Sequence, residues 1–214
     1  MTLHIAHYTL GQLGTNTYLI ADPETKEATV IDPAEGSSTI LKAALQPSWR
    51  LTQVWLTHSH FDHLSGIPEI IAESRPPPPV YIHSSDRELY EHGGGADLFG
   101  FSVPNLPEPE IIFDNQETIS LGKMQLTVQH TPGHSPGHVT FYCPEASVAF
   151  CGDVIFFMGI GRTDLPGGSY PTLINSIKSH ILDLPPETRL LCGHGPETTV
   201  AQEAAGNPFL FSQL

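Results

Sequence analysis

A histidine cluster in the first third of the chain carries the clearest chemical signal, within the run Thr57-His58-Ser59-His60-Phe61-Asp62-His63. Side chains on an extended backbone alternate with a period of two, so we expect His58, His60 and Asp62 to project to one side. Imidazole nitrogens and a carboxylate oxygen suit Zn, Fe or Mn better than Ca or Cu(I). A polar loop with surface histidines is the competing explanation, but three histidines and one aspartate within six positions favour a metal site.

Three later segments place a histidine or an aspartate after a strand-like run and beside glycine. They are Thr131-Pro132-Gly133-His134, Cys151-Gly152-Asp153 and Cys192-Gly193-His194. Glycine lets the backbone turn tightly and bring the polar side chain toward a shared centre. With the first cluster, these segments supply five histidines and two aspartates, enough for two metals that share a carboxylate.

The elements that must position these residues alternate along the chain. In the first half we expect strands over 17–22, 27–33 and 51–60, helices over 37–46 and 62–74, and a further strand from Val80. Pro68 requires the second helix to start late or to kink. The segment 75–80, with four prolines, is predicted to be a stiff connector within one domain that spans residues 1–214.

The second half is rich in predicted strands, over 118–130, 138–144, 146–153 and 188–194, with one clear helix over 173–184. Two successive halves of strands and helices predict an α/β layered architecture. In it, two sheets pack face to face and the helices lie outside.

Composition and charge exclude several classes of partner. The chain has 214 residues, with 9 Lys and Arg against 23 Asp and Glu, and its formal net charge is −14 at pH 7. Proteins that bind nucleic acid or anionic membranes use excess Lys and Arg to neutralise phosphates, so we expect neither partner. No run approaches the ~18 apolar residues of a membrane span, and the N-terminus lacks the basic and apolar regions of a signal peptide.

The three cysteines indicate the redox environment of the protein. Cys143, Cys151 and Cys192 form no CxxC pair and cannot make an even disulfide framework, which favours a reducing environment. Cys151 and Cys192 each lie two residues before a candidate ligand in an apolar run, so we predict them to be small core residues. We therefore expect a cytoplasmic protein.

The candidate ligands, in their order along the chain, resemble the ligand pattern of the metallo-β-lactamase superfamily, and the resemblance covers nearly the whole chain. The resemblance implies an αββα sandwich of two mixed sheets, with the site at the edge between them. It also implies one metal held by His58, His60 and His134, a second held by Asp62, His63 and His194, and Asp153 bridging the two. Asp32, in the segment VIDP, matches a superfamily position that orients ligands, although an aspartate that caps its own turn is an equally ordinary explanation.

The segments around the ligands resemble the single-domain bacterial form of glyoxalase II. They are Thr131-Pro132-Gly133-His134, Gly161-Arg162-Thr163-Asp164, Gly193-His194-Gly195-Pro196 and Asn207-Pro208-Phe209. This resemblance implies hydrolysis of a small-molecule thioester, foremost S-D-lactoylglutathione, with Asp62 and Asp153 as catalytic carboxylates. The cofactors would be two divalent ions, Zn²⁺ first and Fe or Mn as alternatives, whose shared hydroxide attacks the thioester carbonyl. Longer glyoxalase II enzymes carry a C-terminal helical extension with glutathione contacts, whereas 20 residues follow His194 here, so those contacts cannot be carried over.

Two other functions remain open at this point. Persulfide dioxygenases of the same superfamily share the GRTD-type loop and use one iron, held by counterparts of His58, His134 and Asp153, but the GHGP and NPF segments favour the hydrolase. A non-catalytic metal-binding module would have lost ligands, and all seven are present.

Four further side chains have no single predicted role. Arg162 and Asp164 pair with each other or reach the substrate, Tyr170 lines the site or packs in its loop, and His138 is a strand residue or a donor behind a ligand. The oligomeric state is left open.

Overall fold

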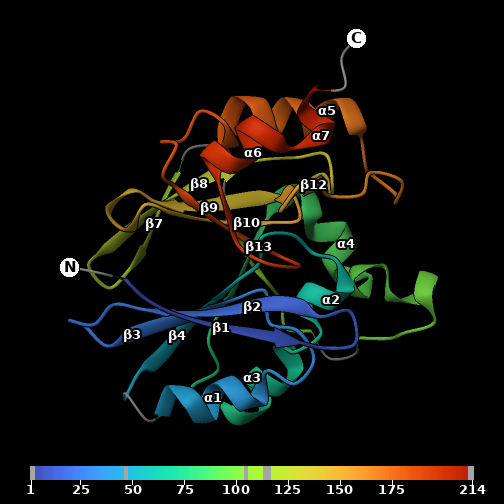
Figure 1. The fold of residues 1–214 in the computed structure, drawn as a ribbon. Coiled ribbons are helices and arrows are strands. Elements are labelled where there is room, and N and C mark those ends of the chain that lie inside the picture. The colour runs from blue at the N-terminus through green and yellow to red at the C-terminus, as the bar shows by residue number, and fades with distance from the viewer. Residues whose placement is uncertain (1–2, 46–47, 104–105, 113–116, 212–214) are drawn as a thin grey trace.

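Two six-stranded sheets lie face to face in the computed structural model, which describes residues 3–45, 48–103, 106–112 and 117–211 (Figure 1). The first sheet contains, in spatial order, β1 (His4–Leu10), β2 (Thr15–Ala21), β3 (Glu27–Ile31), β4 (Arg50–Trp55), β5 (Val80–His83) and β6 (Glu110–Ile112). Its first three strands pair antiparallel, and β3 to β6 run parallel. Parallel pairing needs crossover connections, which the intervening helices supply.

The second sheet has the order β14 (Thr198–Thr199), β13 (Arg189–Cys192), β10 (Val148–Gly152), β9 (Val139–Cys143), β8 (Met124–His130) and β7 (Glu117–Leu121). Only β10 and β13 pair parallel among these neighbours. A short ribbon of β11 (Ile155–Phe156) and β12 (Gly159–Ile160) follows β10. Both large sheets are mixed, as predicted.

The core between the sheets is built by alternate residues of their strands. Tyr18 and Trp55 of the first sheet meet Phe150 and Phe141 of the second, with ring centroids 5.4 and 5.3 Å apart. The residues between them on the same strands face away from the other sheet, toward the helical layer. Both faces of β2 are therefore covered, and the strand is buried along its whole length. Burial on both faces explains why residues 18–21 of β2 are all apolar rather than alternating.

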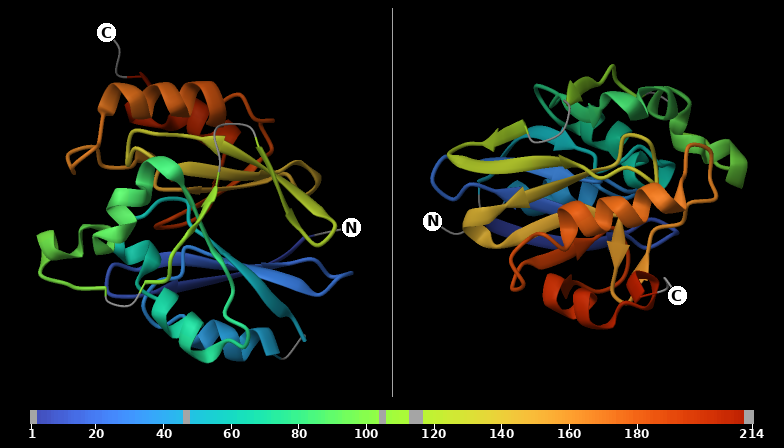
Figure 2. Two further views of the ribbon diagram at one scale, coloured as in Figure 1. Left: turned by 180° about the vertical axis from the view of Figure 1, so that it is seen from behind. Right: turned by 90° about the horizontal axis from the view of Figure 1, so that it is seen from above.

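Helices cover both outer faces and complete the predicted layers (Figure 2). α1 (Ser38–Leu45) and α3 (Ile67–Glu73) pack Ile40 and Ile67 on the first sheet. On the second sheet lie α5 (Tyr170–Ser176), its continuation η4 (Ile177–Ile181), α6 (Val200–Gly206) and α7 (Pro208–Phe211). Leu173 and Ile177 anchor this layer, in a cluster that also holds Cys151 and Cys192. All three cysteines are buried and free, so the predicted core role of Cys151 and Cys192 is confirmed.

Several boundaries differ from the sequence prediction. The helix expected over 62–74 is two helices, α2 (Phe61–Leu64) and α3, separated by Ser65 and Gly66. Gly66 packs so closely that an added Cβ would lie 2.1 Å from the Ala34 carbonyl oxygen. Pro68 then falls in the first turn of α3, which is the late start that its missing N–H requires. The strand expected to reach residue 60 ends at Trp55.

The remaining helical segments are short and were not predicted. They are α4 (Arg87–Glu91), α6, α7, η1 (Ser84–Asp86), η2 (Gly93–Phe99) and η3 (Pro144–Ala146). Across the described ranges, no helix has both the length and the apolar character needed to span a membrane.

Candidate metal centre

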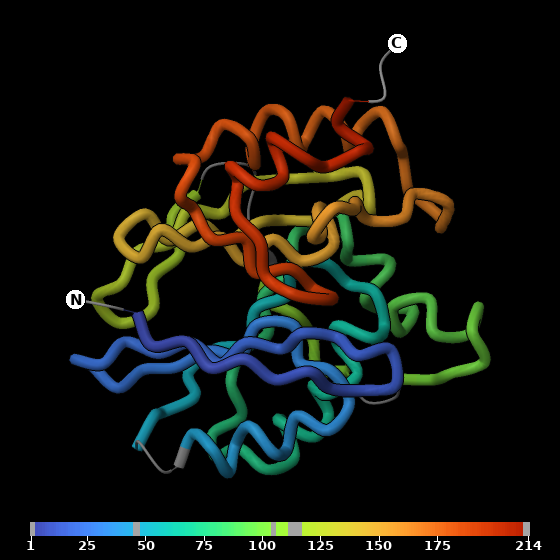
Figure 3. Tube along the Cα trace, in the orientation of Figure 1, coloured from blue at the N-terminus to red at the C-terminus, as the bar shows by residue number. Residues whose placement is uncertain are grey.

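The candidate ligands lie where several strands end at one edge of the sandwich. In the first sheet, β3, β4 and β5 run parallel, so their carboxyl ends meet at the same side. In the second sheet, β10 runs parallel to β13, and both β8 and β10 run antiparallel to β9. Figure 3 shows the red segment after β13 reaching the blue first sheet, where the Asn16 amide donates to the Gly193 carbonyl at 2.7 Å.

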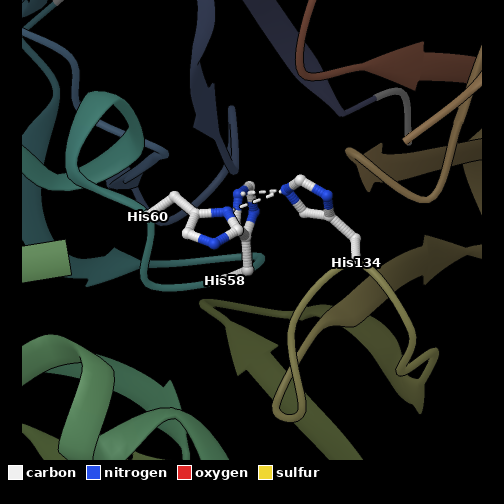
Figure 4. A group of neighbouring side chains, drawn as sticks. All are labelled: His58, His60 and His134. Carbon is white, nitrogen blue, oxygen red and sulfur yellow. Dashed lines mark hydrogen bonds between the residues drawn. The ribbon is translucent and has the colours of Figure 1, made fainter. Parts of the chain in front are cut away.

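Three imidazoles form the first group of ligand candidates (Figure 4). His60 Nδ1 and His58 Nε2 lie 2.8 and 3.2 Å from His134 Nε2. Ligand nitrogens of a tetrahedral zinc ion, each at about 2.0–2.1 Å from the metal, are themselves about 3.3 Å apart, so this spacing suits one ion. Burial lowers the pKa of His58, that of His60 to about 3 and that of His134 to about 4. All three are therefore neutral, the form that binds metal.

Asp62, His63 and His194 form the second group. Asp62 Oδ2 lies 3.2 Å from His194 Nε2 and 3.5 Å from His63 Nε2. Burial would raise the pKa of Asp62, but the two histidines hold it well below its usual range. Burial would likewise lower the pKa of His63, yet the surrounding carboxylates raise it to about 10. The anionic environment therefore favours a cation at this point, whether a proton or a metal ion.

Asp153 lies between the two groups. Its Oδ2 is 3.5 Å from His134 Nε2 of the first group and 3.6 Å from His194 Nε2 of the second. Its Oδ1 is 3.4 Å from His63 Nε2. Burial raises the pKa of Asp153, because a buried carboxylate without a cation is unfavourable. One carboxylate thus contacts histidines of both groups, as a bridging ligand would.

Two buried atoms test whether these residues fit metal ions. His63 Nε2 and Asp153 Oδ1 find no hydrogen-bond partner among the described residues, and such orphaned groups are costly. Gly193 keeps the space around them open, because an added Cβ would lie 2.1 Å from Asp153 Oδ1 and 2.7 Å from His63 Cε1. Five imidazoles and two carboxylates are a donor set for Zn, Fe or Mn. The residues therefore fit two divalent ions.

The residues behind these side chains set their orientation. Asp32 accepts from the Thr57 amide and hydroxyl, both at 2.7 Å, and its Oδ2 lies 3.0 Å from His63 Nδ1. Both carboxylate oxygens therefore contact the segment after β4 that carries Thr57 and His63, which matches the ligand-orienting alternative rather than a turn cap. His134 Nδ1 lies 2.8 Å from the Arg162 carbonyl oxygen. Partners of this kind fix the tautomer and the ring plane of a metal-binding histidine.

Asp86 was not identified from the sequence. It is 1 % exposed at the end of η1, and it accepts from the Ser59 amide at 2.9 Å, the Ser135 hydroxyl at 2.8 Å and the Gly137 amide at 2.5 Å. Ser59 lies between His58 and His60, whereas Ser135 and Gly137 follow His134. One buried carboxylate therefore joins the two loops that carry the first group. No motif surrounds Asp86, so spacing offered no signal for this role.

Two residues at the start of β2 were also missed. Thr15 donates its hydroxyl to Asp62 Oδ2 at 2.9 Å. Asn16 Nδ2 donates to the carbonyl oxygens of Cys192 at 3.0 Å and Gly195 at 2.7 Å, which encloses the turn that carries His194. The only available signal was their place after a glycine-rich turn, and that does not identify partners so distant in the chain.

The GRTD and NPF segments have structural contacts. Arg162 and Asp164 form a two-point ion pair at 2.7 and 2.8 Å, on exposed side chains, so they pair with each other. The contact of this loop with the metal centre is the Arg162 carbonyl described above. Tyr170 is exposed at the start of α5. Asn207 donates to the Gly159 carbonyl at 2.9 Å and to buried Glu203 at 2.8 Å, which links the C-terminal helices to β12.

Comparison with known proteins agrees with this arrangement. A family profile described as the metallo-β-lactamase superfamily matches residues 10–194. The probable metallo-hydrolase YqgX of Bacillus subtilis is 35% identical over 94% of this chain and 94% of its own length. The hydroxyacylglutathione hydrolase GloC of Haemophilus influenzae is 37% identical over 92% of this chain and 93% of its own length.

Solved structures show the same fold. The crystal structure of the BLEG-1 B3 metallo-β-lactamase superposes with a TM-score of 0.89 at 34% identity, over 98% of this chain and 100% of that one. TTHA1623, in a di-iron-bound form, superposes with a TM-score of 0.86 at 38% identity, over 96% of this chain and 100% of that one. With its two mixed sheets, its outer helices and its cluster of histidines and aspartates, this chain belongs to the metallo-β-lactamase superfamily.

Proposed function

We propose that this protein is a binuclear metal-dependent thioester hydrolase, with S-D-lactoylglutathione as the first candidate substrate. The position of Asp153 carries the proposal, because its Oδ2 lies within 3.6 Å of a histidine from each ligand group. One ion would be held by His58, His60 and His134, the other by Asp62, His63 and His194, and Asp153 would contact both. Zn²⁺ is the first candidate, with Fe or Mn as alternatives.

The chain's own residues would prepare the site for hydrolysis. Divalent ions, when bound, would supply a Lewis acid and lower the pKa of a coordinated water to about 7. Asp32 and the Arg162 carbonyl already hold His63 and His134 in place, so little reorganisation is needed when the reacting carbonyl arrives. The leaving thiolate has a conjugate acid with a pKa of about 8.5, so it departs without a strong general acid.

The relatives support this chemistry at different levels. The name of the Haemophilus influenzae relative supports a glutathione thioester, and the di-iron form of TTHA1623 supports iron as an alternative to zinc. The buried free cysteines support a reducing compartment, where glutathione is abundant.

A thioester assay on metal-analysed protein tests the proposal. We expect S-D-lactoylglutathione to release free thiol, and we expect chelation to abolish the release until metal is restored. Asp153→Ala should lower kcat on the order of 100-fold or more while circular dichroism shows a retained fold. His180→Ala, on η4 and on the outer face of the second sheet, is the control and should keep the wild-type rate. Unchanged turnover in Asp153→Ala would contradict the mechanism.

The same metal-analysed protein also tests the alternative function, that of a persulfide dioxygenase. Oxygen uptake is measured with glutathione persulfide as substrate, alongside the metal content. The hydrolase assignment predicts no uptake. Oxygen consumption with about one iron per chain would overturn it.

A further inference from the structure

A cavity of about 270 Å³ lies directly beside the candidate metal centre. Thr15 and Asp62 line it, and the Thr15 hydroxyl donates to Asp62 Oδ2 at 2.9 Å. Asp62 also contacts His63 and His194, so one side chain belongs to both the cavity wall and the second ligand group. A group bound in the cavity is therefore adjacent to the reacting atoms.

Apolar side chains form much of the remaining wall. Phe61, which precedes Asp62, stacks on Phe101 with ring centroids 5.3 Å apart and planes at 21°. Leu13 and Val103 complete this surface. Leu13 is 52 % exposed and Phe101 is 39 % exposed, so these side chains present apolar area that other described residues leave accessible. Apolar surface in a concave site is where ligand binding gains most of its free energy.

The charged side chains of the cavity are all acidic. Glu35 and Glu69 line it together with Asp62, and within the described chain none of its lining residues is Lys or Arg. The two oxygens of Glu69 already accept from the amides of Gly36 and Ser38, each at 2.9 Å. Glu35 is exposed and lies at the rim of the cavity. A ligand carboxylate that reaches the part of the cavity away from the metal centre would meet the like charges of Glu35 and Glu69, with no Lys or Arg among the described lining residues to pair with.

From this charge and shape, and on the basis of the proposed thioester hydrolysis, we propose that the cavity binds the acyl arm of the substrate and selects an uncharged, apolar acyl group larger than lactoyl. A lactoyl group, with about five non-hydrogen atoms, leaves part of this cavity unfilled. Glutathione carries two carboxylates, which the acidic lining disfavours. Hydrolysis breaks the C–S bond, adds the oxygen of water to the acyl carbon, and releases a carboxylic acid and a free thiol.

A panel of thioesters that share one carrier tests the selection. Acetyl-, butanoyl-, hexanoyl- and succinylglutathione are compared by kcat/KM on metal-loaded protein, with S-D-lactoylglutathione included. We expect kcat/KM to rise about fourfold for each methylene buried along the unbranched series. Succinylglutathione, which carries a terminal carboxylate on a four-carbon acyl group, should fall about tenfold or more below butanoylglutathione.

Reversing a charge at the cavity rim gives a variant that tests the selection against a charged acyl group. Glu35→Lys should raise the ratio of succinyl to butanoyl turnover by roughly tenfold. Glu145→Lys makes the same charge change at an exposed residue of η3, in the turn before β10 and thus at the opposite end of that strand from Asp153. This control should leave the ratio as in the wild type.

The outcomes separate this inference from the proposed function. If all acyl groups are hydrolysed at similar rates and Glu35→Lys changes nothing, the cavity proposal is wrong and thioester hydrolysis stands. If no thioester is hydrolysed, the proposed function is wrong, and calorimetric binding of inert S-hexyl- and S-methylglutathione decides the cavity proposal. The cavity proposal requires S-hexylglutathione to bind more tightly than S-methylglutathione, and equal affinities would overturn the cavity proposal.

Discussion

His138 Nε2 accepts the backbone N–H of Asp153 at 3.0 Å. The ring is fully buried, which lowers the pKa of His138 well below its usual value and keeps the imidazole neutral. Because Nε2 is an acceptor, the proton resides on Nδ1, which donates to the Thr131 hydroxyl at 2.9 Å. The sequence allowed a donor behind a ligand, whereas the structure shows an acceptor that holds the backbone of the bridging aspartate.

We predict that His138→Ala lowers metal affinity by about 10- to 100-fold, because it leaves the Asp153 amide buried without an acceptor and frees the carboxylate to move. His138→Gln, whose amide oxygen can accept the same bond, should recover part of the affinity. Competition with a chromophoric chelator measures both variants. His180→Ala is the matched control, and wild-type affinity in a folded His138→Ala protein would refute the positioning role.

A second prediction concerns Asp86, the carboxylate that joins the loops of His58 and His134. Asp86→Asn replaces an acceptor with an amide that clashes with the Ser59 or Gly137 N–H, so the two loops should separate. We expect a changed visible spectrum of the Co²⁺-substituted protein and weaker binding of the ion. A loss of stability of about 1–3 kcal/mol accompanies the unpaired donors.

Asp22 supplies the control for Asp86. It is also a buried carboxylate with three donors from two chain segments: the Glu24 amide, the Thr25 hydroxyl and the Lys123 amide. Asp22 follows Ala21 at the end of β2, while Thr15 at the other end contacts the metal centre. Asp22→Asn should therefore lower stability without changing the Co²⁺ spectrum. An altered spectrum in both variants, or in neither, would contradict a specific role for Asp86.

Local patterns mark the candidate ligands in the sequence, but they indicate neither how these side chains group in space nor which residues support them. All seven candidate ligands lie together, since glycine and strand ends mark them in the sequence. The alternation argument placed Asp62 with His58 and His60, yet Asp62 joins His63 and His194 because the chain enters α2 at Phe61.

Contacts between residues far apart in the sequence account for the supporting residues and short helices that local patterns did not predict. Asp86 and Ser135 are 49 residues apart, and Asn16 and Cys192 are 176 apart, so no local spacing connects them. The short helices α6 and α7 are held by bonds of Glu203 to the Met158 amide and of Asn207 to the Gly159 carbonyl rather than by a long apolar period. Packing between distant segments, which propensity does not encode, decides both.

Gly193 provides a third prediction. In Gly193→Ala the new Cβ meets Asp153 Oδ1 at 2.1 Å, so the carboxylate or the His63 ring must shift. We expect metal affinity to fall by about 10- to 100-fold and stability to fall by about 1–3 kcal/mol. Gly159→Ala, whose nearest neighbour would be an ordinary 3.6 Å away, should bind metal normally. Equal metal content and equal thioester turnover in the two variants would show that the Gly193 contact is relieved without consequence.

The pH dependence of stability is predicted at Asp22, far from the ligands. Burial would raise the pKa of Asp22, but hydrogen bonds from Lys123 and Thr25 lower it below its ordinary value. A lowered folded-state pKa stabilises the protein above the unfolded value of about 3.9, and that stabilisation is lost as the pH falls through the folded value. Urea unfolding in chelator should show a wild-type advantage over Asp22→Asn at pH 7 that shrinks toward pH 3. A constant difference would contradict the assignment.

Metal stoichiometry tests the division of the ligands into two groups. His134 belongs to the three-imidazole group and His194 to the group with Asp62 and His63, so each single alanine variant should retain about one of two ions per chain. Bound metal stabilises only the folded state, by about 2.7 kcal/mol for free metal at 100 times its Kd, so chelation should lower the melting temperature less in either variant than in the wild type. The double variant should bind no ion tightly and should melt at the same temperature with or without chelator. If His134→Ala alone releases both ions, the two groups do not bind independently, and Asp153 couples them into one site.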